Sequence, residues 1–248
     1  MAATVSIITV CFNSEKTIRR TIESVLNQSS NDFEYLIIDG KSTDSTLSIV
    51  EEYMDKFKSK GIDYRVVSER DTGIYDAMDK GIELAVGEVI GIINSDDWYE
   101  PTAVETAIIG YKKHNYEIYM CSLNLIQENK NRKRVKIPRV RGYKTSRDLC
   151  HPSMFVAKSG YRRLGLYRKD VFYADFDFWL RAFKAKANIV VSNKVVANYT
   201  MGGVSNQKTI TKMIMRIKDR NQAYSRNGYS KMYILESIVI EVAKMILA

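Results

Sequence analysis

Two adjacent carboxylates follow directly on a strongly apolar stretch. The segment Gly91-Ile-Ile-Asn-Ser-Asp-Asp-Trp-Tyr-Glu-Pro101 passes from β-branched residues into Asp96 and Asp97. Like charges at the edge of a sheet repel each other and are poorly screened, so a cation is expected beside them. Mg²⁺ and Mn²⁺ prefer carboxylate oxygens, and Mg²⁺ is commonly held by one or two carboxylates and substrate phosphates. The alternative is a helix cap, because Asp often precedes a helix with Pro in its first turn.

The elements that must position these carboxylates follow an alternating pattern. Apolar runs predict strands at 5–10, 35–39, 64–67 and 89–93. Helical periodicity predicts helices at 18–26, 47–57 and 73–85. Strands that are apolar on both faces and alternate with helices predict a parallel sheet covered on both sides.

Polar residues follow each of the four predicted strands, at 9–13, 39–42, 68–71 and 94–97. In parallel sheets, ligands bind beyond the carboxyl ends of the strands. All four polar groups are therefore expected to line one crevice, which favours a ligand site over a simple cap at Asp96 and Asp97.

The pattern changes after residue 115. Apolar runs at 117–126 and 134–137 lack an intervening helix and predict a hairpin or a mixed-sheet edge. The remaining predicted elements are a strand-like segment at 151–156, a helix start at 173–181, strands at 189–191 and 195–199, and a loop at 202–205.

Composition is that of an ordinary globular chain: 248 residues, 45% hydrophobic and 27% charged, with 3 Pro and 13 Gly. Cys11, Cys121 and Cys150 lack metal-ligand spacing and no signal peptide precedes the first strand, which together predict core thiols in a reducing cytosol. No run reaches the roughly 20 apolar residues of a membrane span. The apolar segment 232–248 predicts either a helix packed on the body or a helix that binds a membrane surface or a partner.

The net charge of +9 is unevenly distributed. Such a concentration indicates solvated surface or an anionic partner, namely nucleic acid, phospholipid or a phosphorylated substrate. Nucleic acid is disfavoured, because Tyr143 is the one interleaved aromatic and no nucleic-acid-binding motif accompanies the run. The basic residues between positions 130 and 147 are Lys130, Arg132, Lys133, Arg134, Lys136, Arg139, Arg141, Lys144 and Arg147.

Six motifs in a fixed order together resemble the family 2 glycosyltransferases, inverting enzymes of the GT-A fold, here of the bacterial polysaccharide or O-antigen type. The resemblance spans roughly residues 4 to 205. It implies an α/β protein with a Rossmann-like, mostly parallel central sheet flanked by helices. The motifs are Ser6-Ile-Ile-Thr-Val-Cys-Phe-Asn13, Ser24-Val-Leu-Asn-Gln28, Ile37-Ile-Asp-Gly-Lys-Ser-Thr-Asp44, Asp71-Thr-Gly-Ile-Tyr-Asp-Ala-Met-Asp-Lys-Gly81, Asn94-Ser-Asp-Asp-Trp98 and Ala174-Asp-Phe-Asp-Phe178.

The implied organisation is a glycosyltransferase domain at 1–205 and a basic, apolar helical extension at 206–248. Within the domain, residues 1–98 form the nucleotide-sugar-binding half and residues 99–205 the acceptor-binding half.

The resemblance also implies donor-binding residues. Asp39 would accept the imide N–H of uracil, and Thr9 and Asn13 would hold the nucleoside. The alternative for Asp39, which precedes Gly40, is a turn former. Further donor-binding candidates are Arg70 and Asp71 on the same rim, Lys80 one helical face beyond Asp71, and Ser95.

The Asp-X-Asp motif of the family falls on Asn94-Ser95-Asp96, so an amide replaces its first carboxylate. Asn94 would bond a ribose hydroxyl or a metal-bound water. Asp96, helped by Asp97, would bind the Mn²⁺ or Mg²⁺ that neutralises charge on the departing diphosphate.

The catalytic base implied by the resemblance is Asp175, with Asp177 as its rival. Both carboxylates would also favour the dipole of a helix that starts there. Arg181, four residues after Asp177, is expected to form a helix-surface ion pair. Asp177, His151 and Arg181 are also candidates for residues that support catalysis. His151 is expected either to make a structural hydrogen bond or to lie near the diphosphate and the acceptor.

The resulting hypothesis is an inverting glycosyltransferase that moves a sugar from a UDP-sugar to a hydroxyl of a lipid-diphosphate-linked saccharide in surface polysaccharide synthesis. It would be cytoplasmic and peripheral on the inner face of the cell membrane, attached to its anionic surface, with no nucleic-acid partner. Two alternatives stay open: a sugar-phosphate nucleotidyltransferase, disfavoured by the lack of a glycine-rich phosphate loop, and a non-catalytic binder of sugar nucleotides or anionic surfaces.

Overall fold

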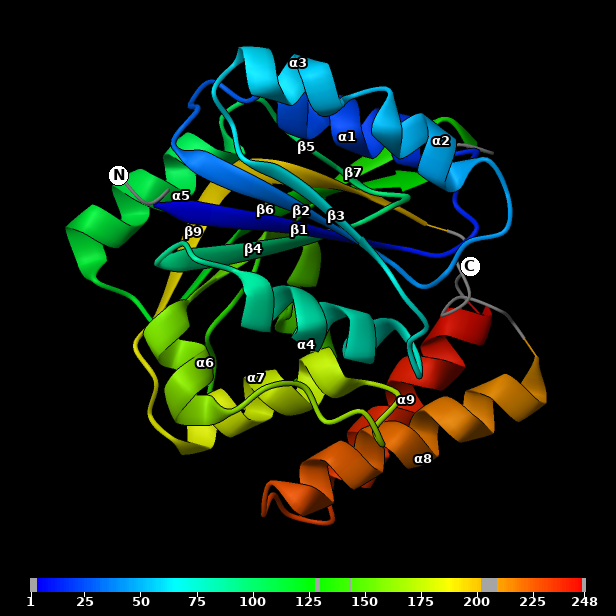
Figure 1. Ribbon diagram of the computed structural model, residues 1–248. Helices are drawn as coiled ribbons and strands as arrows, with labels where there is room; N and C mark the ends of the chain where they lie inside the picture. The colour runs from blue at the N-terminus through cyan, green and yellow to red at the C-terminus, as the bar shows by residue number, and fades with distance from the viewer. Residues whose placement is uncertain (1–3, 128–129, 143, 202–208, 247–248) are drawn as a thin grey trace.

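The computed structural model describes residues 4–127, 130–142, 144–201 and 209–246. A curled mixed sheet runs through the molecule, with helices on both faces (Figure 1). Its strand order is β3-β2-β1-β4-β8-β6-β9-β5, and β7 pairs with β6. The strands are β1 (Val5–Cys11), β2 (Phe33–Asp39), β3 (Tyr64–Ser68), β4 (Val89–Asn94), β5 (Trp98–Tyr99), β6 (Ile118–Gln127), β7 (Arg132–Lys136), β8 (Met154–Ala157) and β9 (Ile189–Thr200).

The four N-terminal strands are parallel and end together. In the β1–β2 pair Cys11 lies opposite Asp39, and in the β2–β3 pair Asp39 lies opposite Ser68. On the other side of β1, Val10 lies opposite Asn94. This register confirms the predicted parallel sheet and its single edge of polar strand ends.

The second half of the sheet is mixed. β8 is antiparallel to both β4 and β6, and β6 and β7 form the predicted hairpin. β9 runs parallel to β6 and antiparallel to β5. The two strands predicted at 189–191 and 195–199 are one continuous strand, because a β-bulge shifts the register without ending the pairing. The loop predicted at 202–205 lies outside the described residues.

Alternate residues of the strands feed two apolar cores. Ile7 belongs to the core beneath α1, α3 and α5, whereas Ile8 belongs to the core beneath α4, α6 and α7. The region predicted as one helix at 47–57 is broken around Tyr53, whose buried ring packs into the first core while its hydroxyl donates to Glu23. The helices are α1 (Ile18–Leu26), α2 (Thr46–Glu51), α3 (Met54–Ser59), α4 (Ile74–Leu84), α5 (Ala103–His114), α6 (Lys158–Leu164), α7 (Ala174–Lys184), α8 (Ile210–Arg226) and α9 (Tyr233–Ile246), with short 3₁₀ turns η2 (Ser146–Asp148) and η3 (His151–Ser153).

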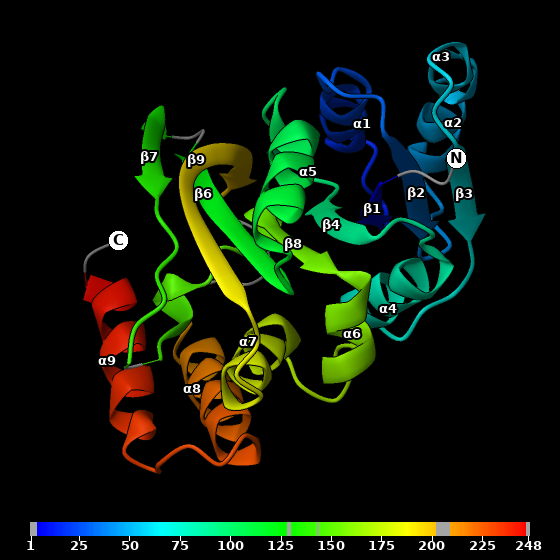
Figure 2. The same ribbon diagram turned by 90° about the vertical axis from the view of Figure 1, so that its left-hand side faces the viewer.

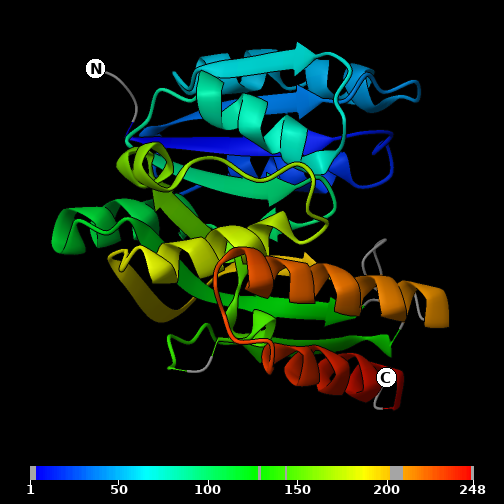
Figure 3. The same ribbon diagram turned by 90° about the horizontal axis from the view of Figure 1, so that it is seen from below.

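The two C-terminal helices form a hairpin against the body (Figure 3). Glu241 of α9 accepts hydrogen bonds from two buried arginines of α8, at 2.6 Å from Arg216 and 3.0 Å from Arg220. Asn227, just after α8, donates to Asp177 of α7 at 2.7 Å. The C-terminal segment therefore packs on the body, which was the first of the two alternatives predicted for it. The predicted domain boundary at residue 205 lies outside the described residues and stays a prediction.

Candidate functional site

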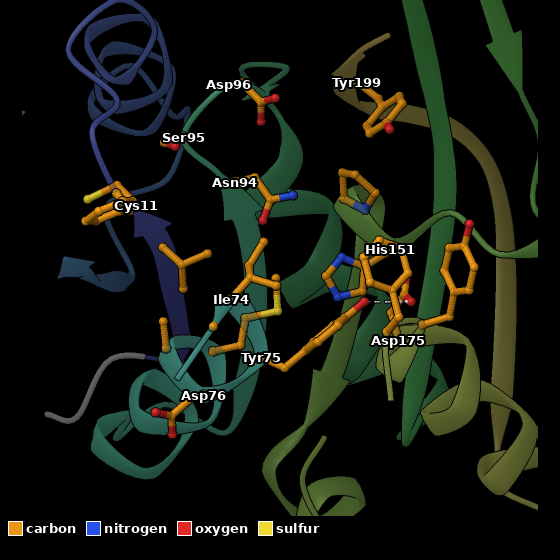
Figure 4. Close-up of a pocket in the computed structure, with 18 of the residues that line it drawn as sticks. Cys11, Ile74, Tyr75, Asp76, Asn94, Ser95, Asp96, His151, Asp175 and Tyr199 are labelled. Carbon is orange, nitrogen blue, oxygen red and sulfur yellow. Dashed lines mark hydrogen bonds between the residues drawn. The ribbon is translucent and has the colours of Figure 1, made fainter. Parts of the chain in front are cut away.

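A cavity of about 1380 Å³ opens beyond the carboxyl ends of the parallel strands. Residues from both halves of the chain line it, and Figure 4 shows Asn94, Ser95 and Asp96 on one side with His151 and Asp175 on the other. The sheet register explains the first group, because β1 and β4 end side by side. The second group comes from η3 and the start of α7.

Asp39 and Thr9 lie behind this cavity and do not line it. Asp39 is fully buried and accepts hydrogen bonds from the amide of Ser42 and from the hydroxyls of Ser42 and Ser68. Thr9 is also buried and accepts a hydrogen bond from Tyr35 at 3.0 Å. Asp39 therefore has the contacts of a turn former, and its pairing with uracil stays a prediction.

Two other predicted donor residues do line the cavity. Asn13 has a positive φ of 48° and accepts a hydrogen bond from the amide of Thr43 at 2.9 Å. Asp71 accepts one from the amide of Gly73 at 2.9 Å, and its carboxylate lies against Gly40. A Cβ at Gly40 would lie 2.5 Å from Asp71 Oδ2, so Gly40 provides the space for this carboxylate. The sequence alone indicated Gly40 as a turn residue and did not reveal this close approach.

Arg70 and Lys80 interact with each other outside the cavity lining. The Lys80 ammonium donates to the backbone carbonyl of Arg70 at 2.7 Å and pairs with Glu69 at 2.9 Å. Their predicted contact with the donor is not tested by this arrangement and stays a prediction.

The segment after β4 places Asn94, Ser95 and Asp96 at the cavity. The Asn94 Oδ1 atom is buried and accepts no hydrogen bond from the described residues. Ser95 shares a hydrogen bond with Ser14 at 2.8 Å. Burial raises the pKa of Asp96, and no other described residue donates to its carboxylate. A cation near Asp96 would therefore stabilise its charged form.

Asp97 points away from the cavity, although it is adjacent to Asp96. It is fully buried, its Oδ1 atom accepts the amide of Thr200 at 2.8 Å, and its carbonyl accepts the hydroxyl of Thr21 at 2.6 Å. Burial raises the pKa of Asp97 well above its usual value, and the neighbouring charge of Asp96 adds to this effect. Asp97 thus ties the end of β9 to the turn after β4, and the structure does not bring it to the cavity with Asp96.

The donor set for a divalent ion is therefore small. Within the part of the chain that the structure describes, no cluster of three or more His, Cys, Asp or Glu side chains could hold a metal. Asp96 and the unsatisfied oxygen of Asn94 nonetheless fit a Mg²⁺ or Mn²⁺ ion that takes its remaining ligands from water and substrate phosphates.

Asp175 and Asp177 occupy different faces at the start of α7, because residues two apart on a helix point in nearly opposite directions. Asp175 lines the cavity and its Oδ1 atom accepts hydrogen bonds from the Tyr75 hydroxyl at 3.0 Å and the Phe176 amide at 2.8 Å. Asp177 is fully buried and accepts hydrogen bonds from Arg168 at 3.0 Å and Asn227 at 2.7 Å. Asp175 is thus the acidic residue of this pair that reaches the cavity.

The other two candidate supporting residues, His151 and Arg181, also differ in whether they reach the cavity. His151 lines the cavity, its Nε2 atom lies 3.0 Å from the Tyr167 hydroxyl, and burial lowers its pKa. Arg181 lies outside the cavity lining, 3.8 Å from Asp177, and donates to the carbonyls of Leu164 and Leu166. Arg181 therefore forms its expected ion pair with Asp177, but the pair is buried and not on the helix surface, because Asp177 is fully buried. Arg181 also fastens the segment after α6.

Several lining residues were not expected from the sequence. Lys169 pairs with Asp76 at 2.5 Å, and this hydrogen bond lowers the pKa of Asp76 to about 2. Asp76 and Tyr75 lie within the motif at 71–81, so the motif was a usable signal for them. No sequence pattern indicated the contribution of α8, whose Met215, Asp219 and Arg220 reach the cavity.

Comparison with known proteins identifies the family. The model of the glycosyl transferase family 2 matches residues 6–176. The chain belongs to this family. A PGL/p-HBAD biosynthesis glycosyltransferase of Mycobacterium bovis (strain BCG / Pasteur 1173P2) is 29% identical over 207 residues, which cover 81% of this chain and 78% of the relative. Chondroitin synthase of Escherichia coli is 29% identical over 239 residues, covering 92% of this chain but 33% of that protein.

Solved glycosyltransferase structures share the fold. Residues 1–349 of Staphylococcus aureus TarS, in complex with UDP, match with a TM-score of 0.65 at 16% identity, over 98% of this chain and 72% of that chain. The mannosyltransferase PcManGT of Pyrobaculum calidifontis, in complex with GDP-Man and Mn²⁺, matches with a TM-score of 0.69 at 15% identity, over 99% and 70% of the two chains. The protein is a family 2 glycosyltransferase with the GT-A fold, as its motifs predicted.

Proposed function

We propose that this glycosyltransferase moves a sugar from a UDP-sugar to an acceptor hydroxyl with inversion at the anomeric carbon. The observation that carries the proposal is one cavity with Asp96 on the donor edge and Asp175 on the facing side (Figure 4). The complexes of related folds with UDP and with GDP-Man support a nucleotide-sugar donor in general. The motifs of the chain support UDP among these nucleotides.

Asp175 is the proposed general base. As the acceptor oxygen forms its bond to the anomeric carbon, the bond from that carbon to the nucleotide oxygen breaks, and UDP departs with the bonding electrons. The acceptor proton passes to the Asp175 carboxylate. Attack from the face opposite to UDP inverts the configuration, and the position of Asp175 across the cavity from Asp96 suits this geometry.

Asp96 and Asn94 would hold Mg²⁺ or Mn²⁺, which supplies positive charge to the departing diphosphate when it is bound. The protein's own contribution here is a partly buried carboxylate that accepts no hydrogen bond from any other described residue and lies within the electrostatic influence of Arg20.

The proposed acceptor is a saccharide on a lipid diphosphate, presented at the anionic inner face of the cell membrane. A surface with the required character lies on one flank, where Figure 2 shows β7 and α9 on the same side. Arg132 and Arg134 are exposed on β7, and Val135, which follows Arg134, is 56% exposed. On α9, Leu235 and Val239 are 59% and 66% exposed. Basic side chains interspersed with apolar ones favour an anionic lipid surface.

Among the described residues, no helix combines the length and the apolar content that a membrane crossing needs. The proposed association is therefore peripheral, through the membrane-facing surface formed by the exposed residues of β7 and α9.

A sugar-nucleotide screen tests the donor assignment. The purified chain is incubated with UDP-sugars and GDP-mannose, with and without Mn²⁺, while thermal stability and released products are measured. Selective stabilisation by one UDP-sugar, with UDP as the released product, is expected. Release of pyrophosphate in the presence of a sugar phosphate and UTP would indicate a nucleotidyltransferase, and binding without any turnover would indicate a non-catalytic binder.

A further inference from the structure

One hydrogen bond joins the donor side of the cavity to its proposed base. Tyr75 lies in the first turn of α4, two residues after Gly73, and its hydroxyl donates to Asp175 Oδ1 on α7 at 3.0 Å (Figure 4). The two residues are 100 positions apart in the chain. Since α4 follows directly on Asp71, which lines the donor side, this contact connects the two halves of the site.

The hydrogen bonds of Asp175 are concentrated on one oxygen. Oδ1 accepts from both the Tyr75 hydroxyl and the Phe176 amide. Among the described residues, none donates to Oδ2. A carboxylate held at one oxygen by two donors has a fixed orientation and keeps the lone pairs of the other oxygen available for a proton.

Tyr75 is itself held rigidly. Its ring lies 5.4 Å from that of Tyr167, whose hydroxyl is 3.0 Å from His151 and whose amide donates to Asp79 at 3.0 Å. Burial, together with the negative charge of Asp175, raises the pKa of Tyr75 well above its usual value. The phenol therefore stays protonated, and remains a donor, over the whole range in which an enzyme operates.

We propose that Tyr75 is a positioning residue that clamps Asp175 through Oδ1 and thereby directs Oδ2 toward the acceptor hydroxyl. This inference rests on the proposed role of Asp175 as the base. It makes the geometry of the base depend on α4, and so on the segment that carries the donor-side residue Asp71.

The test compares Tyr75→Phe with Tyr64→Phe, Asp175→Asn and the double variant. Tyr64 is a matched control, because its hydroxyl also makes one intramolecular hydrogen bond, to the Val50 carbonyl at 3.0 Å. The side chain of Tyr64 packs against the core beneath α1, α3 and α5, away from Asp175. Turnover is measured as UDP released from the UDP-sugar that best stabilises the wild type, with water as acceptor. Nucleotide affinity, thermal stability and the pH–rate profile are recorded for each variant.

We expect Tyr75→Phe to lose about 10-fold to 100-fold in turnover, the usual effect of removing one hydrogen bond to a charged group, while UDP affinity is retained. The acidic limb of its pH–rate profile should move to higher pH, because the carboxylate loses a donor that stabilises its charged form. The other titratable groups that face Asp175 are His151, Tyr167 and Tyr173, and all three are unchanged in this variant. Tyr64→Phe should behave like the wild type in both respects.

The double variant separates failure of this inference from failure of the proposed base. If Tyr75 acts through Asp175, adding Tyr75→Phe to Asp175→Asn should have no further effect. An inactive Asp175→Asn beside a Tyr75→Phe with wild-type turnover and pH profile would overturn the positioning role alone. A fully active Asp175→Asn would overturn the assignment of the base, and the positioning role with it.

Discussion

At the scale of single residues, the environment of each carboxylate decides its role. Asp96 and Asp97 are adjacent, yet the first lines the cavity and the second is fully buried beside Thr200. Asp175 and Asp177 diverge in the same way, toward the cavity and toward Arg168 respectively. In both pairs the cavity-facing carboxylate keeps capacity to bind something outside the protein.

Asp96→Ala should abolish the metal dependence of UDP binding while the fold is retained, because the side chain lies at the end of a strand and holds no other described side chain. Titration calorimetry with UDP and Mn²⁺ measures this directly. Asp71→Ala serves as a comparison, because Asp71 also lines the cavity but follows β3, on the other side of β1 from β4. UDP affinity in Asp96→Ala that still rises with Mn²⁺ would exclude Asp96 as the metal ligand.

Asp175→Asn should retain UDP affinity and lose about 10²- to 10⁴-fold in turnover, because the amide keeps the shape of the carboxylate but cannot accept a proton. Asp177→Asn should instead lower thermal stability, since it leaves Arg168 and Arg181 without their buried anion. Turnover of the remaining folded protein at saturating donor distinguishes the two. An inactive Asp177→Asn beside an active Asp175→Asn would reassign the base to Asp177.

The buried carboxyl group of Asp79 should make the free energy of unfolding depend on pH. Its carboxyl accepts the amide of Tyr167 in a buried site, and desolvation raises its pKa to about 6. Because the folded-state pKa lies above the unfolded value, the stability that Asp79 contributes in its protonated form is complete below pH 4 and is lost as the pH rises through 6.

Asp79→Asn keeps the acceptor oxygen without the charge, so the variant should gain about 1–3 kcal/mol relative to the wild type between pH 4 and pH 8. Urea denaturation of both proteins across this range gives the difference. A difference that does not vary with pH would contradict the assignment.

At the scale of elements, the ends of the parallel strands and two helix starts build the site. β1 and β4 end in register beside the cavity, and α4 and α7 begin at it. The residues at the start of α4 and α7 meet in the hydrogen bond between Tyr75 and Asp175. The site therefore depends on how α4 and α7 are held against the sheet, and α7 in turn packs against α8.

Glu241→Gln should destabilise the hairpin of α8 and α9 by about 3–5 kcal/mol, because it leaves the buried guanidinium groups of Arg216 and Arg220 without their shared anion. Since Arg220 also lines the cavity, turnover should fall in proportion to the fraction of molecules in which the hairpin is unfolded. Thermal and urea unfolding are the measurements. Glu51→Gln, at an exposed position of α2, is the control that should leave stability unchanged.

At the scale of the whole molecule, the exposed surface of β7 and α9 that is proposed to face the membrane lies on one flank (Figures 2 and 3). α9 cannot simply be deleted to test this surface, because Glu241 and Ser237 on its inner face are fully buried. Substitutions confined to its outer face leave these contacts in place.

Leu235→Gln with Val239→Gln, and separately Arg132→Gln with Arg134→Gln, should weaken binding to vesicles that contain anionic lipid. The expected loss is roughly 1 kcal/mol per basic residue removed near the surface. Co-sedimentation at low and high salt measures binding, and Lys112→Gln with Lys113→Gln on α5 is the charge-matched control. Binding that survives both pairs of substitutions and high salt would contradict a membrane role for this surface.

The sequence by itself determined the parallel half of the sheet and the edge at which the site lies. Apolar runs and helical periods are local properties, and short connections between alternating strands and helices place the strand ends side by side. The matched ends of β1, β2, β3 and β4 follow from this pattern.

Only the tertiary structure decided which side chains at that edge face the cavity. The direction of Asp97, the burial of Asp39 and the close approach of Asp71 to Gly40 depend on backbone geometry in turns that no period describes. The hydrogen bond between Tyr75 and Asp175 joins residues 100 positions apart, and it exists because α4 and α7 pack over the same face of the sheet. Contacts of this kind arise from the packing of whole elements, which a local pattern of residue types does not contain.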